Sequence, residues 1–422
     1  MSDYFDRVER QLVAKVEAGL PRRSRFPVRL DHLAVAASLL VVIAVGAVFI
    51  SVRGSRSADS PAGARATTIV FSASPLALRA PLGPSIAGSI RILRQRLDSG
   101  FGGGVRVFRA GSNVVIAVPE AAAVTRGQIA ALAVPARLEF YDWEANALTP
   151  NGMTVASQLL SQNPTALQIS QGGGSAAPGE PGAGSLPLYQ AVKLASKQPP
   201  LTTLDASRSG PQYYLFGAPG STTCKTAARD QGEPVAAGVH CLLSGPDRDP
   251  QALDSDLPAG VSASQGHRLE VPAGMIVLQA ANLTPNPTPI SSPAARFYVL
   301  KDNIALSDAD ITNPQQSTDS GGSPDVKFGL NSAGATEFQK LTEEIARRGD
   351  AVSGLGQIYD QHFAIALDDQ LVTVPSIDFK IYPDGITPRQ GADITGAFTK
   401  QSARTLATLL RYGPLSVNLA AH

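Results

Sequence analysis

Two adjacent carboxylates, Asp368 and Asp369, are the strongest candidates for chemistry in this sequence. Such a pair could bind a cation or act as an acid and a base. The same pair is also typical of a tight turn, in which an aspartate side chain accepts bonds from nearby backbone amides. We favour the turn. His362 precedes the pair at the start of a predicted strand, and we expect it at the surface or at a sheet edge.

The remaining motifs do not indicate catalysis. The five histidines are scattered, and no two of them have the spacing of metal ligands. The glycine-rich stretch at 100–104 follows a predicted helix, whereas a phosphate-binding loop precedes one. Neither GxSxG, HExxH, a P-loop nor CxxC occurs. We therefore expect no catalytic residue, no cofactor and no metal site. The net charge of +1 gives no indication of nucleic-acid binding.

The only two cysteines, Cys224 and Cys241, could form a disulfide. In an oxidising compartment such a bond would stabilise the fold by roughly 3 kcal/mol through the loop that it closes. Two unpaired thiols are the alternative, because the sequence does not supply the geometry.

The compartment is indicated by an apolar stretch at 33–52, twenty residues without a charge. As a helix it would be about 30 Å long, enough to cross a bilayer. More arginines precede it than follow it closely, which places the N-terminal side in the cytoplasm and the rest outside. A cleaved signal peptide is the alternative. We predict an amphipathic cytoplasmic segment at 1–30, a membrane helix at 31–53 and a linker at 54–66.

The following residues predict an α+β fold. Residues 67–144 have the order βαββαβ, which indicates a ferredoxin-like unit whose last strand is "ARLEFYDW". Residues 145–295 are rich in glycine and proline and predict an irregular insertion with the cysteine pair, in which we expect helices at about 151–162 and 186–197 and a buried strand at 271–280. Residues 296–422 contain a strand "VKFGLN", a long helix ended by Gly349 and a hairpin around Asp368. On the long helix, Glu344 and Arg348 have the spacing of an exposed ion pair.

Three stretches carry a resemblance to a known family: "VKFGLNSAGATEFQKLT", "FAIALDDQLVTVPSID" and "ITGAFTKQSARTLATLLRYGPLSVNL". They resemble the first large extracytoplasmic domain of SecD, a subunit of the SecDF accessory complex of the bacterial protein translocase. The upstream "IRILRQRLDSGF", with its R-x-R pattern, resembles the SecD base subdomain. The motif positions that we carry over are Phe328, Asn331, Gly334, Phe338, Thr342, Asp368, Pro375, Ile377, Gly396, Phe398, Thr399, Arg411 and Gly413.

The resemblance implies a base at 67–144 and a mobile head that holds preprotein leaving the Sec channel, with residues 296–422 forming the head and returning to the base. In that family, proton flow through later membrane helices is thought to drive the head. The present sequence stops at "RYGPLSVNLAAH", where relatives enter the membrane again, and Leu33 to Val52 contains no ionisable residue. We therefore expect a single-pass protein without a proton-driven motor of its own.

Three functions follow as hypotheses. The first is a membrane-anchored SecD-like protein that binds exported polypeptide or Sec translocase subunits and assists export. The second is a single-pass interaction or signalling protein that reuses the SecD head fold, because a fold does not fix a function. The third, an enzyme, is the least supported.

Overall fold

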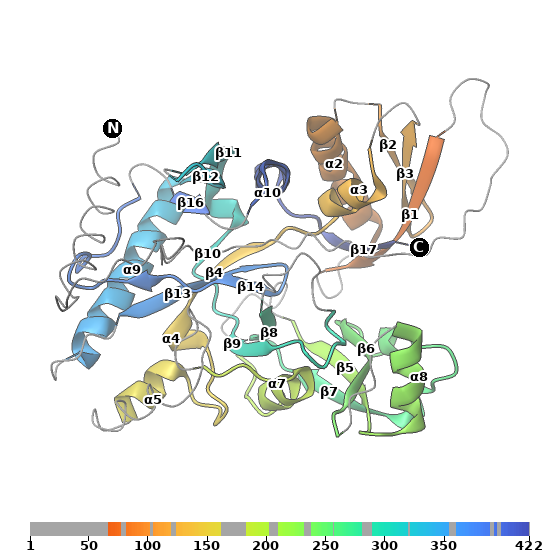
Figure 1. Cartoon of the computed structure of the whole chain (residues 1–422), viewed down its shortest axis with the longest axis horizontal. Helices are drawn as coiled ribbons and strands as arrows, with labels where there is room; N and C mark the ends of the chain where they lie inside the picture. The colour runs from red at the N-terminus through yellow and green to blue at the C-terminus, as the bar shows by residue number, and fades with distance from the viewer. Residues whose placement is uncertain are drawn as a thin grey trace, which may run out of the picture. The chain divides into compact units, whose positions relative to one another are not determined.

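The computed structural model describes residues 66–76, 82–101, 104–119, 124–161, 183–201, 210–231, 238–255, 257–280, 289–319, 321–353, 360–388, 392–394 and 398–421. The predicted amphipathic segment, membrane helix and most of the linker lie outside these ranges. Within them, none of the helices has the length and apolar composition needed to cross a membrane. The described residues have the predicted α+β class (Figure 1).

The first sheet is antiparallel, with the strand order β17-β1-β3-β2. Its elements are β1 (Ala66–Pro75), α2 (Leu82–Phe101), β2 (Arg106–Ala110), β3 (Asn113–Pro119) and β17 (Val417–Ala421). α2 buries Ile86, Ile90 and Leu93 against the sheet, one helical turn apart. We call this unit the base, and its strand order is that of a ferredoxin-like sheet.

The strand that closes the base differs from our prediction. The predicted sixth element, β4 (Leu138–Asp142), pairs in another sheet. The edge next to β1 is instead taken by β17, preceded by α10 (Lys400–Tyr412), so that the two ends of the described chain lie side by side (Figure 1). Local sequence patterns predict that a strand exists but not which distant strand it pairs with, and this explains the error.

Two arginines of α2 explain the R-x-R pattern. The exposed Arg94 donates to the backbone oxygen of Val107 on the edge strand β2, through Nε at 3.0 Å and Nη2 at 2.5 Å. Arg96 has 0% exposure and donates four bonds of 2.6 to 3.1 Å to backbone oxygens. The acceptors are Leu132, Val134, Pro135 and Gly413. Arg96 thereby ties α2 to the chain after α3 (Arg126–Leu132) and to the end of α10.

The second sheet is the largest, and we call it the central sheet. Its order is β10-β4-β13-β14-β8-β9, with β15 also paired to β13. The strands besides β4 are β8 (Met275–Ala280), β9 (Phe297–Lys301), β10 (Leu306–Ser307), β13 (Gln361–Leu367), β14 (Gln370–Thr373) and β15 (Ser376–Ile377). β14 and β8 are parallel, and the other neighbours are antiparallel.

Both faces of the central sheet are covered, and every residue of β4 is buried. Leu138 and Phe140 face a core completed by α9 (Ser332–Val352), α10 and a three-stranded sheet. That sheet has the order β11-β12-β16, from β11 (Ile311–Thr318), β12 (Pro324–Leu330) and β16 (Ala392–Ile394). Tyr141 faces a second core built with β8, β9 and α4 (Trp143–Asn146). β4 is therefore an interior strand.

Residues 145–295 contain more regular structure than we expected of an irregular insertion. The expected helices are present as α5 (Val155–Ser161) and α7 (Leu188–Ala195), and the expected strand at 271–280 is present as β8. A three-stranded sheet that we did not expect has the order β6-β5-β7, from β5 (Gln212–Gly217), β6 (Cys241–Asp247) and β7 (Gly266–Val271). It is accompanied by α8 (Thr222–Gln231), and short 3-10 turns lie at Ala252–Asp254, Ala263–Gln265 and, further on, Asp308–Asp310. Frequent glycine and proline mask the short apolar runs that form this sheet.

Cys224 on α8 and Cys241 on β6 are joined by a disulfide, with Cα atoms 5.6 Å apart. Gly217 of β5 lies beneath the bond, where a Cβ atom would come within 2.8 Å of both sulfur atoms. The disulfide thus fastens α8 to the sheet at a point where only glycine fits without a shift.

We predict that reducing this disulfide lowers the free energy of unfolding by about 3 kcal/mol, because a 17-residue separation is no longer constrained in the unfolded chain. Urea unfolding followed by circular dichroism with and without dithiothreitol measures the change. The double variant Cys224→Ser/Cys241→Ser is the control and should not respond to dithiothreitol. Equal midpoints of the untreated and the reduced protein would contradict the prediction.

Candidate functional site

An apolar cavity of about 210 Å³ lies between the central sheet, α9 and the sheet that contains β12 and β16. Its wall is almost entirely apolar, with Thr373 and Asp393 as the side chains that bring polar atoms. The lining residues are Phe140, Leu306, Phe328, Leu330, Phe338, Phe363, Ile365, Thr373, Pro375, Ala392, Asp393 and Ile394. An apolar cavity of about 150 Å³ can hold benzene, so this one has room for a large apolar side chain.

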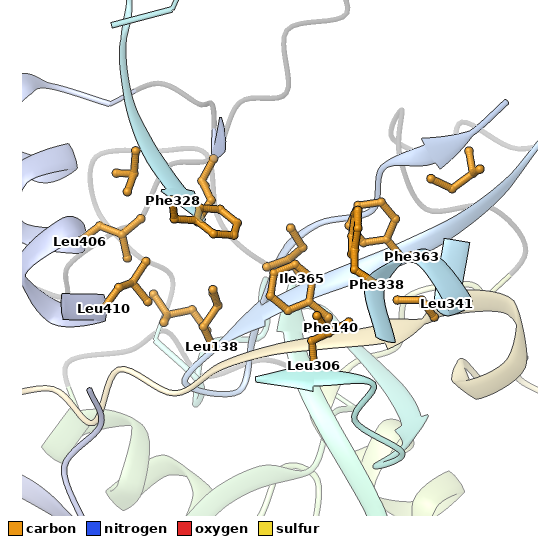
Figure 2. Close-up of a cluster of buried hydrophobic side chains, with 14 of the residues drawn as sticks. Leu138, Phe140, Leu306, Phe328, Phe338, Leu341, Phe363, Ile365, Leu406 and Leu410 are labelled. Carbon is orange, nitrogen blue, oxygen red and sulfur yellow. The ribbon is translucent and has the colours of Figure 1, made fainter. Parts of the chain in front are cut away.

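Four phenylalanines from four elements contribute to the wall. Figure 2 shows Phe328 of β12 on one side of the cluster and Phe338 of α9 with Phe363 of β13 on the other. Phe338 meets Phe363 edge to face, with ring centroids 5.7 Å apart, and Phe140 of β4 stacks on Phe363 at 6.4 Å. Such contacts hold aromatic rings in defined positions. The cavity wall is therefore preorganised.

The motif residues at the start of α9 position Phe338. Asn331 is the N-cap and accepts from the Gly334 amide at 2.7 Å. Gly334 packs so closely on the 3-10 turn at Asp308–Asp310 that a Cβ atom would lie 2.6 Å from the Cβ of Asp310. Thr342 donates to the Phe338 oxygen at 2.8 Å and accepts from the Ile386 amide at 2.7 Å. These residues fix the helix and the loop beside it.

The acidic pair forms the turn of the β13–β14 hairpin. Asp368 and Asp369 have φ values of 50° and 62°, the left-handed region that a two-residue hairpin turn requires. The Asp368 carboxylate accepts from the amides of Ala136 and Arg137, each at 2.9 Å. Burial raises the pKa of Asp368, and these two amide bonds oppose that shift. The structure thus gives Asp368 a positioning role, because it holds the start of β4.

The other motif residues are spread over the same region. Pro375 lines the cavity, whereas Ile377 and Phe398 are buried in the surrounding core. Thr399 caps α10, Arg411 donates to the Pro314 oxygen at 2.9 Å, and Gly413 ends α10 with a φ of 75°. Gly396 lies outside the described residues. The disulfide of Cys224 and Cys241 belongs to a different sheet and does not contact the cavity lining.

Asp393 of β16 is the charged residue of the cavity lining. Its carboxylate lies 4.0 Å from the Lys327 ammonium on the neighbouring strand. Burial raises the pKa of Asp393, and Lys327 opposes the shift. Because the rest of the lining is apolar, the cavity favours an apolar side chain of a bound polypeptide. Asp393 and Lys327 favour the polar backbone of that polypeptide near them.

A buried ionic cluster, which the sequence analysis missed, joins α9 to β4 and β13. Arg348 donates to both carboxylate oxygens of Asp142, at 3.0 and 2.5 Å, and lies 3.7 Å from Glu144. Glu144 accepts from the backbone amide of His362 at 2.9 Å and lies 2.7 Å from its Nδ1.

The expected surface pair of Arg348 with Glu344 is therefore wrong, and His362 is half-buried at an internal strand start. α9 also continues past Gly349 to Val352.

None of these groups forms a metal cluster or a catalytic set. Within the part of the chain that the structure describes, no three His, Cys, Asp or Glu residues are placed to hold a metal ion. The cavity lining contains neither a histidine nor a cysteine. What the site can do is bind an apolar group, and its chemistry is recognition.

The comparisons with known proteins point to the region that contains this cavity. Residues 284–417 match the family model described as the SecDF P1 head subdomain. That segment is homologous to SecD. Every residue of the cavity lining except Phe140 lies within it.

Curated relatives show distant similarity over part of the chain. The protein translocase subunit SecD of Rickettsia typhi is 32% identical over 124 residues, which are 29% of this chain and 20% of the relative. The subunit of Rickettsia prowazekii is 28% identical over 214 residues, 50% of this chain and 33% of the relative. The chain therefore spans a third or less of the length of these relatives. A solved structure of SecDF, titled as a membrane component that enhances protein export, is 16% identical with a TM-score of 0.36, covering 84% of this chain and 97% of that one.

The match agrees with two expectations from the sequence. SecD is a non-enzymatic accessory component of the translocase, and from the sequence we expected no enzymatic activity. The SecDF P1 domain is an extracytoplasmic part of a membrane protein, and the match to its head covers residues 284–417, which we expected outside the cytoplasm.

Proposed function

We propose that this chain is a membrane-anchored, extracytoplasmic SecD-like protein that binds exported polypeptide and thereby assists protein export. Residues 33–52 serve as the membrane anchor, with the N-terminal side in the cytoplasm. Subunits of the Sec translocase are the expected protein partners. The observation that carries the proposal is the preorganised apolar cavity within the segment homologous to the SecDF head.

The surroundings of the cavity suit an extended chain. β16 contributes Ala392, Asp393 and Ile394 to the lining and, among the described residues, pairs on one side only, with β12. An added strand can bond to such an edge through main-chain groups, which every sequence provides. Every second side chain of the added strand then points to the same side, so that an apolar one can enter the cavity. This mode selects for unfolded chains with exposed apolar residues and tolerates different sequences.

We predict that Thr373→Phe weakens binding of an unfolded peptide by about tenfold or more, because the new ring occupies the cavity and excludes an apolar side chain worth about 1.5–3 kcal/mol. The probe is a fluorescent glycine–serine peptide with two phenylalanines, measured by anisotropy. Thr318→Phe on β11 is the matched control, since Thr318 is exposed and does not line the cavity. Equal affinity of the two variants would place any binding elsewhere.

The role in export is tested in cells. Photo-crosslinking probes at Gln339, on the cavity helix α9, and at Lys400, exposed at the start of α10, report what lies against this region. We expect the probes to capture exported chains or Sec subunits. In the Thr373→Phe background, the Gln339 probe should lose this capture. Capture of unrelated envelope proteins alone would overturn the proposal and favour an interaction protein that keeps the fold.

A further inference from the structure

A tyrosine hydroxyl lies between two buried carboxyl groups on the side of the central sheet away from the cavity. The Tyr141 hydroxyl is 2.8 Å from a carboxyl oxygen of Glu139 and 2.9 Å from one of Asp302. Tyr141 is 0% exposed, Glu139 4% and Asp302 6%. Glu139 and Tyr141 belong to β4, and Asp302 lies in the connection between β9 and β10.

When both carboxyl groups are ionised, the cluster has a single hydrogen atom, that of the tyrosine hydroxyl, for two hydrogen-bond contacts. A phenol donates one hydrogen bond, and an ionised carboxylate only accepts. The hydroxyl can therefore donate to Glu139 or to Asp302, but not to both at once. The second contact becomes a hydrogen bond only when one of the two carboxyl groups carries a proton and donates to the tyrosine oxygen. Both contacts are therefore hydrogen bonds only when the cluster binds one additional proton.

Charged groups of both signs surround the cluster. Arg137, also on β4, lies 3.0 Å from Asp369 of the hairpin turn, and the neighbouring Asp368 accepts two backbone amides. Arg248, which follows β6, is a second cation close enough to feel Glu139, Asp302 and Asp369. Four carboxyl groups, at positions 139, 302, 368 and 369, thus lie near three guanidinium groups, at positions 96, 137 and 248.

We propose that Glu139, Tyr141 and Asp302 form a buried proton-binding switch that fastens β4 to the β9–β10 connection when one proton is bound and loosens it when the proton leaves. In the protonated state a continuous chain of hydrogen bonds runs from Glu139 through Tyr141 to Asp302. In the deprotonated state two carboxylates repel each other in a medium that screens charge poorly. Phe140, on the opposite face of the same strand, lines the apolar cavity, so the switch acts on a strand of the cavity wall.

The electrostatics of the site support a switch near neutral pH. Burial raises the pKa of Glu139 from 4.5 to about 7, and Asp302 adds to the shift while Arg137 opposes it. A carboxyl group whose pKa is higher in the folded than in the unfolded state stabilises the fold below the unfolded value. That stability is lost as the pH rises through the folded value. For Glu139 the window therefore runs from 4.5 to about 7.

The test is the pH dependence of unfolding of the full chain, followed by the fluorescence of Trp143. This residue is the only tryptophan, is fully buried and lies two positions from Tyr141. We expect the folding equilibrium constant to fall on the order of a hundredfold more in the native protein than in Glu139→Gln between about pH 5 and about pH 8. Glu270→Gln, at an exposed site on β7, is the control and should keep the native slope.

Infrared difference spectroscopy provides a measurement that does not depend on variant stability. At mildly acidic pH the native protein should show the carbonyl band of a protonated, hydrogen-bonded carboxyl group, and the band should shift in Tyr141→Phe. Its disappearance at alkaline pH, together with the slope difference of Glu139→Gln, is the expected outcome. A native protein without this band, or a Glu139→Gln variant with the native slope, would overturn the proposal.

Discussion

Replacing Arg96 with alanine is expected to lower the free energy of unfolding by about 4 kcal/mol or more, because the oxygens of Leu132, Val134 and Gly413 lose the bonds that Arg96 donates and each buried unsatisfied group costs about 1–3 kcal/mol. The fourth acceptor, the oxygen of Pro135, keeps a bond from the Leu415 amide at 2.9 Å. Burial lowers the pKa of Arg96 to about 10, so its guanidinium is still charged at neutral pH and makes strong hydrogen bonds.

The neighbouring Arg94 offers a matched control on the same helix. It is exposed and bonds to a single oxygen, that of Val107, so Arg94→Ala should cost about 1 kcal/mol. Urea unfolding of both variants, followed by circular dichroism, gives the two free energies. If Arg96→Ala costs no more than Arg94→Ala, the four bonds do not hold the base together.

The second large effect is expected at Arg348. Arg348→Ala leaves Asp142 and Glu144 as buried carboxylates without their guanidinium partner, and breaking such a pair costs about 3–5 kcal/mol. The side chain of Arg348 is 19% exposed and that of Glu144 is 3% exposed, so little of this loss is screened by solvent. We expect a drop in the urea midpoint and a loss of the rigid contact between α9 and β4.

The adjacent residue again supplies the control. Arg347 lies on the same helix but is exposed, and Arg347→Ala should change the stability by less than about 0.5 kcal/mol. A double-mutant cycle with Asp142→Ala separates the interaction between Arg348 and Asp142 from their other contacts. We expect a coupling free energy of about 2 kcal/mol. Additive effects of Arg348→Ala and Asp142→Ala would show that the two side chains do not stabilise each other.

The elements could be predicted from the sequence wherever a local pattern decides them. The apolar spacing of α2 and a turn at Asp368 and Asp369 follow from rules that act within a few residues, and the same rules place the cap of α9 at Asn331 or Ser332. The apolar side chains around the cavity could be anticipated as core residues in the same way. That they leave a cavity could not, because a cavity depends on how four separate elements meet.

The errors have a common physical cause, which is packing between distant segments. Glu139 and Tyr141 alternate with apolar residues and appear to face solvent, yet a second core covers their side of the strand. Arg348 has ion-pair spacing with Glu344, yet it turns inward because Asp142 and Glu144 would otherwise be buried carboxylates without a cation. The direction in which these side chains point is set by residues that lie far away in the sequence.

The pairing of β1 with β17 imposes an order of events on biosynthesis. Ser72 bonds to the oxygen of Ala420, a partner 348 positions later. At roughly 5–20 residues per second, a ribosome needs between about 17 and 70 seconds to make the intervening chain. Throughout that time one edge of β1 lacks its neighbour and is exposed to unwanted pairing. The base sheet is thus completed only after the strands of the central sheet and of both three-stranded sheets have been made.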